Sequence, residues 1–449
     1  MLAAYEELAT QNWNMSEVTW TGCMLLSENK AQCYFFKPHN TGHIYAYRFG
    51  LSCDGQYTYN VATGICESPT EPQESKEKGV PPPLACIANP INLTSGNKFQ
   101  EEIDLAKSTS TPHFSRYYNS SDGLWSHSYA TRLALGEKNI TLIRHDGYQS
   151  SFSLNGIIIE PEANELGKLT RESSTWAYTS PYNETLIFDL TGRLIKKTLP
   201  SGIVHNIYYP NNSIIVTSSL GGTLSFQQDS RYQPTSLTAA GMSATYSYNT
   251  YGRLINISKI INNQTQVRQY HYEVPSKPNL LTGITDERGV RHATWAYDDQ
   301  DRAISSEHAD GADKVTLTYN TDGSTTVTNE LGKKATYRFE TIQGIRRIVA
   351  IEGEPTPNCP NSNSSFTYDN RGLLKTKTDN KGILTTYDYN DRGLEVSRTE
   401  AAGTPQARTT TTTWHPTLFL PLTVTEAGRT THYQYDNQGR QISQTTDSL

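Results

Sequence analysis

The sequence predicts an all-β repeat protein, in which antiparallel β-hairpins form one curved, spiralling sheet. A turn unit of an aromatic residue, Asp or Asn, two further residues and Gly recurs along the chain, and Phe366 to Glu400 shows two successive copies. The segments between turns are short, rich in Thr and Tyr and roughly alternating in polarity, as half-buried strands are. The chain has 28 Tyr and only 4 Met, which fits a sheet core of Tyr, Thr, Ile and Val rather than a helical core rich in Leu.

The repeat has a nearly constant period. Aligning the turns on the Asp or Asn position gives markers 19 to 29 residues apart, at Asp189, Pro210, Asp229, Asn249, Glu273, Asp298, Asn320, Glu340, Asp369, Asn390, His415 and Asp436. A second glycine stands eight residues before six of the markers, at Gly202, Gly221, Gly241, Gly332, Gly382 and Gly428. With two turns per period, each unit is predicted to be one β-hairpin and its connection.

We predict that the residues of these turns are structural rather than catalytic. An Asp or Asn side chain can accept a hydrogen bond from the backbone two residues later, and Gly adopts the positive φ that other side chains resist. The predicted structural residues are Asp189, Gly192, Asn249, Gly252, Asp369, Gly372, Gly382, Asn390, Gly393, Gly428, Asp436 and Gly439. A tyrosine also recurs beside the marker, and we interpret it as the repeated core contact between stacked units, at Tyr248, Tyr297, Tyr368, Tyr389 and Tyr435.

The first region, residues 1–66, is predicted to be a small cysteine-containing module. It holds four of the six cysteines, Cys23, Cys33, Cys53 and Cys66. Residues 53–66 have the pattern of a hairpin, so we predict a Cys53–Cys66 disulfide, although four cysteines allow three pairings. A zinc site is the competing hypothesis, with the ligand set Cys33, His39, His43 and Cys53.

The remaining regions are a linker, a strand-rich segment and the array. Residues 67–85 are dense in Pro, Glu, Lys and Ser and end in three prolines before Leu84, which predicts an extended, solvated linker. Residues 86–165 are predicted to be strands that precede the array, and residues 166–449 are the array itself. Its one long interruption, residues 353–364, is predicted to be an exposed loop, where Cys359 is either a free thiol or a partner of Cys86.

The segment before the array contains large apolar anchors on predicted strands: Phe114, Tyr117, Trp125 and Tyr129. His127 stands among them and could act as a catalytic base. No Ser or Cys nucleophile motif accompanies it, so we interpret His127 as a packed strand histidine.

These units resemble the YD repeats of bacterial Rhs proteins, above all in FTYDNRGLLKTKTDNKG, YDYNDRGLEVSRTEAAG, YSYNTYGRL and YQYDNQGRQ. NPINLTSGNK, FSRYYNS and GLWSHSY resemble the segment that precedes the array in the same family, so the resemblance covers residues 86–449. It implies a hollow β-cage that encloses a C-terminal toxin, with a self-cleaving aspartyl-protease motif at their junction. No Asp-Pro-x-Gly-Leu junction follows Asp436. Residues 440–449 have the pattern of an ordinary repeat strand without a cap, so we expect this chain alone to form an open sheet with an uncovered concave face, to enclose no cargo and to self-associate through its last strand.

Composition and missing motifs argue against several classes of function. The formal net charge is -6 without a basic run, so nucleic acid is not expected as a partner. No apolar stretch is long enough to span a membrane and no secretory signal is visible, so secretion or cell-surface display is expected by another route. Motifs for hydrolases, phosphate loops, zinc proteases and calcium loops are missing, so neither an enzyme nor a cofactor is expected.

Two functions remain open at this stage. The first is a structural shell segment of an Rhs-type protein, whose partners are a C-terminal toxin or further shell units and secretion machinery. The alternative is a glycan-binding or adhesion module of the cell surface, in which exposed Tyr and Trp on the sheet bind the ligand.

Overall fold

The computed structural model describes residues 19–27, 30–37, 40–47, 58–60, 65–67, 76–81, 90–108, 110–211, 213–353, 362–436 and 439–448, and in the first five ranges it describes the backbone alone. The chain forms two compact units, Met1–Pro69 and Thr70–Leu449. Apart from a three-residue 3-10 turn, η2 (Ala309–Gly311), every named element of the described part is a β-strand. The predicted all-β class is therefore confirmed.

The described strands of the first unit form a three-stranded sheet and a separate hairpin. The antiparallel sheet contains, in order, β1 (Thr19–Ser27), β2 (Lys30–Lys37) and β3 (Asn40–Tyr47). The hairpin joins β4 (Thr58–Asn60) to β5 (Ile65–Glu67).

For the cysteines of this unit, the described backbone shows only which residues lie opposite one another in neighbouring strands. Cys23 lies opposite Cys33 in the β1–β2 ladder, and Cys66 lies opposite Tyr59 in the hairpin. The predicted Cys53–Cys66 disulfide and the competing zinc site both lie outside the residues whose side chains are described. The disulfide therefore stays a prediction.

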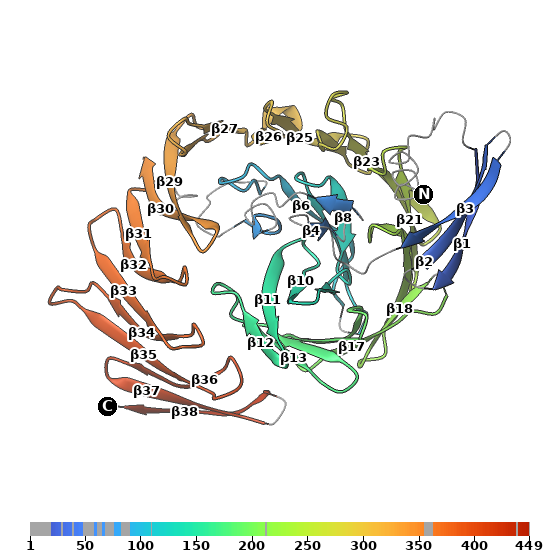
Figure 1. Cartoon of the computed structure of the whole chain (residues 1–449). Coiled ribbons are helices and arrows are strands. Elements are labelled where there is room, and N and C mark those ends of the chain that lie inside the picture. Colours follow the sequence, from blue (N-terminus) through green and yellow to red (C-terminus); the bar gives the residue numbers. More distant parts are fainter. Residues whose placement is uncertain are drawn as a thin grey trace. The chain divides into compact units, whose positions relative to one another are not determined.

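Two small antiparallel sheets precede the array in the second unit. The three-stranded sheet consists of β6 (Phe99–Leu105), β7 (Phe114–Asn119) and β8 (Leu124–His127). The four-stranded sheet consists of β9 (Arg132–Leu135), β10 (Asn139–Ile143), β11 (Gln149–Asn155) and β12 (Ile158–Pro161). We call residues 90–161 the inner segment, because these strands lie within the curve of the array in Figure 1.

The array is a single antiparallel sheet of 26 strands. Its first part consists of β13 (Lys168–Arg171), β14 (Trp176–Thr179), β15 (Thr185–Phe188), β16 (Leu194–Thr198), β17 (Val204–Tyr208), β18 (Ile214–Ser218), β19 (Thr223–Gln228), β20 (Pro234–Ala239) and β21 (Met242–Tyr248). Its middle part consists of β22 (Leu254–Ile261), β23 (Gln264–His271), β24 (Gly283–Thr285), β25 (Arg291–Tyr297), β26 (Ala303–His308), β27 (Val315–Tyr319), β28 (Thr325–Thr328), β29 (Lys334–Ile342) and β30 (Ile345–Gly353). Its last part consists of β31 (Ser364–Tyr368), β32 (Leu374–Thr378), β33 (Leu384–Tyr389), β34 (Glu395–Glu400), β35 (Arg408–Trp414), β36 (Pro421–Glu426), β37 (Arg429–Tyr435) and β38 (Gln441–Ser448).

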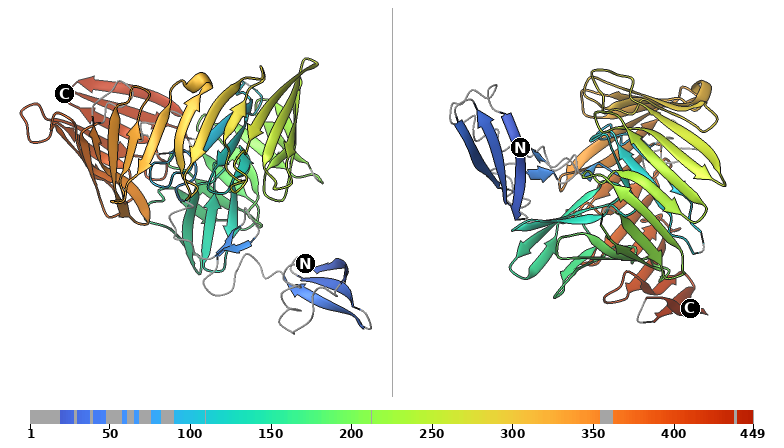
Figure 2. Two further views of the ribbon diagram at one scale, coloured as in Figure 1. Left: turned by 90° about the horizontal axis from the view of Figure 1, so that it is seen from above. Right: turned by 90° about the vertical axis from the view of Figure 1, so that its right-hand side faces the viewer.

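Each array strand pairs with the next in chain order, without a crossover. No ladder among the described strands joins β38 to β13, so this sheet is not closed into a barrel. The sheet curves along its length, as Figures 1 and 2 show, and its late turns reach its beginning. The Asn183 side chain accepts a hydrogen bond from the backbone N–H of Phe419 at 2.8 Å and donates to its carbonyl at 3.0 Å. The sheet therefore spirals back onto its own first strands.

The inner segment packs against the concave face of the array. The four predicted anchors are all buried, and Trp125 meets the Tyr270 ring edge-on at 5.0 Å between centroids. The Trp125 indole N–H also donates to the Tyr272 hydroxyl at 3.1 Å. Further along, Ile91 and Leu93 are buried in a second core cluster with residues of β26 to β31. The expectation of an uncovered concave face is therefore wrong where the inner segment lies.

One predicted turn marker is wrong. Glu340 lies inside β29, and the connection to β30 comes three residues later at Gln343 and Gly344, both with positive φ. These two strands have nine residues each, longer than most strands of the array. The longer hairpin displaces its turn, so spacing alone misplaces it. The other eleven markers lie in connections between strands, and residues 354–361 of the predicted loop lie outside the described part.

Candidate functional site

The turns of the array share one hydrogen-bonding device. In nine described turns a side-chain Oδ1 accepts the backbone N–H groups two and four residues later, at 2.8 to 3.0 Å. The nine residues are Asp189, Asp229, Asn249, Asp286, Asp298, Asn329, Asp369, Asp379 and Asn390. Asp436 accepts the N–H of Arg440 at 2.9 Å. The turn backbone therefore uses the oxygens of these carboxylates and amides as hydrogen-bond acceptors.

Glycine takes the fourth position of these turns in six of the seven predicted cases, and Gly428 lies instead in the two-residue turn between β36 and β37. All seven predicted glycines have φ between 72° and 85°: Gly192, Gly252, Gly372, Gly382, Gly393, Gly428 and Gly439. Two turns place another residue there, since Tyr232 and Asp301 both have a φ of 64°. This conformation costs a side-chain-bearing residue roughly 1–2 kcal/mol, so these two turns contain local strain.

His415 replaces Asp in one turn and takes over its task. The Nδ1 atom of its imidazole accepts the backbone N–H groups of Thr417 at 3.2 Å and Leu418 at 3.0 Å. A lone pair on the side chain, rather than a carboxylate charge, is what this turn requires.

In several units the tyrosine before the marker joins its unit to the one before it. The hydroxyl donates to a backbone carbonyl 14 to 20 residues upstream, at 2.5 to 2.8 Å, in six units. The donors are Tyr209, Tyr248, Tyr297, Tyr319, Tyr368 and Tyr389. Burial raises the pKa of Tyr368 to about 12, so the hydroxyl keeps its proton and remains a donor.

Arginines before the turn glycine add a second link, toward the following unit. The Arg371 guanidinium donates to the carbonyl of Asn390 at 2.9 Å. The Arg392 guanidinium donates to three carbonyls of the next turn, those of His415 at 2.6 Å, Pro416 at 2.9 Å and Leu418 at 2.8 Å. These cations therefore bind backbone within the sheet.

A buried ion cluster holds the inner segment against the array. Arg116 on β7 forms two hydrogen bonds to the carboxylate of Asp104, at 2.5 and 3.0 Å, and donates to the Tyr270 hydroxyl at 2.7 Å. Lys259 and the Tyr246 hydroxyl complete the shell of the carboxylate, at 3.0 and 2.8 Å. Burial alone would raise the pKa of Asp104, but the charges of Arg116 and Lys259 outweigh burial and hold that pKa below its ordinary value.

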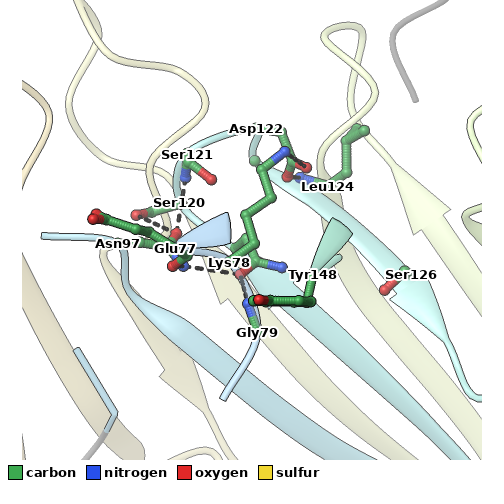
Figure 3. Close-up of polar contacts among 12 residues, drawn as sticks. Glu77, Lys78, Gly79, Asn97, Ser120, Ser121, Asp122, Leu124, Ser126 and Tyr148 are labelled. Carbon is green, nitrogen blue, oxygen red and sulfur yellow. Dashed lines mark hydrogen bonds and ion pairs between the residues drawn. The ribbon is translucent and has the colours of Figure 1, made fainter. Parts of the chain in front are cut away.

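A second cluster docks the residues just before the inner segment, which we call the strap (residues 76–81; Figure 3). The Gly79 N–H donates to Asn119 Oδ1 at 2.9 Å, and the carbonyl of Glu77 accepts the Asn92 amide at 3.0 Å. Lys78 pairs with Asp122 at 3.0 Å. The prediction of a wholly solvated linker over 67–85 is therefore wrong for the strap, whose backbone groups find partners.

The strap explains why the motifs of this region contain asparagine. Asn119 Oδ1 also accepts the Asn97 amide at 2.9 Å, and Asn119 Nδ2 donates to the carbonyl of Asp146 at 2.8 Å. One amide thus joins the strap to three other segments of the chain. A Cβ on Gly79, whose φ is 80°, would lie 2.5 Å from the Asp146 carboxylate, so only glycine fits there.

Comparison with protein families finds two matches in this chain. The RHS Repeat model matches residues 368–405 and 420–449, where the turn device, tyrosine links and arginine links recur. The chain therefore contains RHS repeats over these two ranges. A model described as a domain of unknown function, DUF6531, matches residues 88–152. This range covers most of the inner segment, including Asn97, Arg116 and Asn119.

Comparison with curated proteins finds no match for this Rhs-repeat chain. Among solved structures it is similar to TcdB2-TccC3 without its hypervariable C-terminal region, with 13% identity over 93% of this chain and 24% of that chain, and a TM-score of 0.32. A second crystal structure, of TcdB2-TccC3, gives 13% identity over 92% of this chain and 26% of that one, with a TM-score of 0.30. The chain spans about a quarter of the length of these proteins.

The structure does not gather the predicted site residues of the Rhs-repeat chain into one place. An even number of strands lies between any two of the turns at Asp189, Asn249, Asp369, Asn390 and Asp436. Because neighbouring strands are antiparallel, these five turns all lie on one rim of the sheet. The turns that contain Gly382 and Gly428 lie on the opposite rim. Spread along two rims, these residues form a repeated structural element and no convergent site.

Sequence reasoning missed part of the turn device. Asp286, Asn329 and Asp379 serve turns on the second rim, and each begins an Asx-x-x-Gly stretch like those of the first rim. That motif could have predicted these three turns from the sequence. The buried cluster around Asp104 had no comparable signal, because its partners come from segments more than 100 residues apart.

One cavity of about 870 Å³ lies where the late turns of the spiral meet its first strands. Ile157, Leu166, Arg171, Arg392 and Phe419 are among its lining residues. Arg392 there is already bound to backbone carbonyls. The described residues hold no cluster of three or more His, Cys, Asp or Glu that could bind a metal. A search of the same residues finds no helix long and apolar enough to cross a membrane.

Proposed function

We propose that this chain is a shell segment of an Rhs-type protein that encloses or presents a C-terminal toxin in bacterial competition. The supporting observation is the single 26-stranded sheet, which follows chain order and curves round a packed inner segment. A wall of this kind grows by adding hairpins, and each is tied to its neighbours by the tyrosine and arginine links. In this proposal the chain is secreted or displayed at the cell surface, and its partners are the toxin, further shell units and secretion machinery.

The same proposal gives the chain a non-catalytic role. The acidic residues that recur most regularly are engaged by turn N–H groups, as Asp369 and Asp379 are. The hydrogen bond from the Ile383 N–H lowers the pKa of Asp379, so the carboxylate stays ionised and is a weak base toward a substrate. No cofactor is part of the proposal.

Protease protection tests the shell. The natural polypeptide that contains this chain would be treated with a nonspecific protease, and the fate of the segment after the array followed by mass spectrometry. We expect that segment to resist digestion while the array is folded and to be cut once the array is unfolded in denaturant. Digestion of the segment at the same rate with the array folded or unfolded would refute enclosure.

A glycan-binding role is the second candidate, because Tyr182 and Tyr251 are 81% and 62% exposed. These two tyrosines do not belong to the buried links, so they could stack on sugar rings. A glycan array distinguishes the candidates. A hit that is lost in Tyr182→Ala but kept in Tyr389→Phe would favour binding, whereas no hit would favour the shell.

A further inference from the structure

We propose that acidification releases the inner segment from the concave face of the array, with His127 as the principal trigger. This inference concerns the contact between the segment and the sheet, so it does not depend on what the shell contains. It rests on the hydrogen bonds and neighbours of the His127 ring.

His127, at the end of β8, is fully buried between the two parts. Its ring stacks on Phe114 at 5.4 Å and meets Phe226 of β19 edge-on at 4.6 Å, between ring centroids. Its Nε2 lies 2.7 Å from Gln228 Oε1, also on β19. The imidazole thus links β8 to β19 through a hydrogen bond, beside the bond from the Trp125 backbone N–H to Gln233 Oε1 at 3.2 Å.

Both ring nitrogens are satisfied only in the neutral imidazole. Nδ1 accepts the backbone N–H of Tyr129 at 3.2 Å, which leaves Nε2 to carry the proton and donate to Gln228. Protonation would put a second N–H on Nδ1, directed at the backbone donor of Tyr129. The hydrogen bond would then become a contact between two donors, beside a buried positive charge.

The hydrogen bond with Gln228 is the one interaction of the ring that favours its charged form, and burial outweighs it. The charged and titratable groups that act on it are Arg132 of β9 and His145 of the β10–β11 turn, and both disfavour the imidazolium. The other elements packed on the ring, β7 and β19, contribute Phe114, Phe226 and the neutral Gln228. No carboxylate is among the groups that act on His127.

Other histidines at the same contact respond in the same direction. His205 of β17 is buried and lies 3.4 Å from the Tyr129 hydroxyl through Nδ1. Burial, with the nearby Lys197, lowers the pKa of His205, and burial with Lys197 and neighbouring histidines lowers that of His113 to about 4. Protonation of one of these rings therefore makes protonation of the next costlier within the docked state, and favours undocking.

The direction of the pH effect follows from linkage. Burial lowers the pKa of His127 from 6.5 to about 4, so the docked state binds its proton less readily than the released state. Docking is then at full strength above pH 6.5, weakens as the pH falls from 6.5 toward 4, and is constant below that. His127 alone would weaken the docking equilibrium roughly a few-hundred-fold across that window.

Hydrogen exchange at a series of pH values tests the inference on the whole chain. Peptides from residues 113–130 should lose protection between about pH 6 and pH 4, after correction for intrinsic exchange, while peptides from β31 to β34 keep theirs. His127→Phe keeps a stacked ring without a titrating group, so its 113–130 protection should vary far less with pH. His432→Gln, on exposed β37, is the control and should behave as the parent does.

Two results would overturn the inference. One is an unchanged pH dependence of residues 113–130 in His127→Phe, and the other is loss of protection in the array at the same pH as in the inner segment. If His127→Phe does not fold, an imidazole NMR titration of the parent decides. A His127 ring that titrates near 6.5 would refute the proposal, and one that titrates about two units lower, together with the loss of protection at 113–130, would support it.

Discussion

Breaking the buried ion pair between Arg116 and Asp104 should destabilise the second unit strongly. The two side chains are 0% and 1% exposed, so Arg116→Met would leave a buried carboxylate without its main partner. Loss of one member of a buried pair costs about 3–5 kcal/mol in general. We expect about 3 kcal/mol, the lower end, because Lys259 and the Tyr246 hydroxyl remain on Asp104 at 3.0 and 2.8 Å.

A double-mutant cycle separates the charge effect from the packing effect. Arg116→Met with Asp104→Leu removes both charges, so the double variant should recover much of the stability that Arg116→Met loses. Urea unfolding, followed by tryptophan fluorescence, measures each free energy, since Trp125, Trp176 and Trp295 are all buried in the second unit. The control is Arg338→Met, which breaks the exposed pair with Glu352 and should leave the unfolding midpoint unchanged. The reasoning fails if Arg116→Met shifts the midpoint no more than this control does.

Three further predictions concern the repeat and the cysteine module. Gly382→Val should cost about 1–2 kcal/mol through backbone strain alone, since φ is 77° and nothing lies within 4 Å of the added Cβ. A thermal melt equal to the parent's would contradict this. Asp301→Gly should give a smaller loss of stability or a gain, because glycine relieves the strain of the φ of 64°. Tyr389→Phe should cost about 1 kcal/mol in urea unfolding, because a 2.8 Å bond to the preceding unit is lost; an unchanged midpoint would show that the hydroxyl is dispensable. Peptide mapping without reductant should recover Cys53 linked to Cys66 after production in an oxidising compartment, and recovery of both as free thiols would exclude the disulfide.

The fold of the array could be predicted from sequence because its information is local. An Asp or Asn and a Gly three residues later determine a turn on their own, and the alternating residues between turns determine a strand. Glu340 shows the limit of this reasoning. Its unit has a longer hairpin, and the turn follows the positive φ of Gln343 and Gly344 rather than the average period.

The contacts of the inner segment could not be predicted, because they are not local. Arg116 meets Tyr270, 154 residues away, and Thr325 donates to the carbonyl of Leu93, 232 residues away. Such contacts depend on the total curvature of the sheet. That curvature is the sum of small twists between many strands, so no single repeat unit determines it. The strap was mispredicted for a similar reason. Its polar composition suggests a solvated segment, but its Gly79 N–H donates a hydrogen bond to Asn119, 40 residues away.

The repeat specifies backbone hydrogen bonds rather than residue identities. Where Asp is absent, His415 presents a ring nitrogen to two N–H groups of its turn, those two and three residues later. In the same unit Trp414 stands in the tyrosine position, and its indole N–H donates to the carbonyl of Glu395 at 2.8 Å. A unit that departs from the Tyr-Asp pattern at both positions thus keeps both links, because any acceptor serves the turn and any buried donor of similar reach serves the neighbouring strand. Degenerate units can therefore be part of one continuous sheet, and their degeneracy alone is no evidence of a functional site.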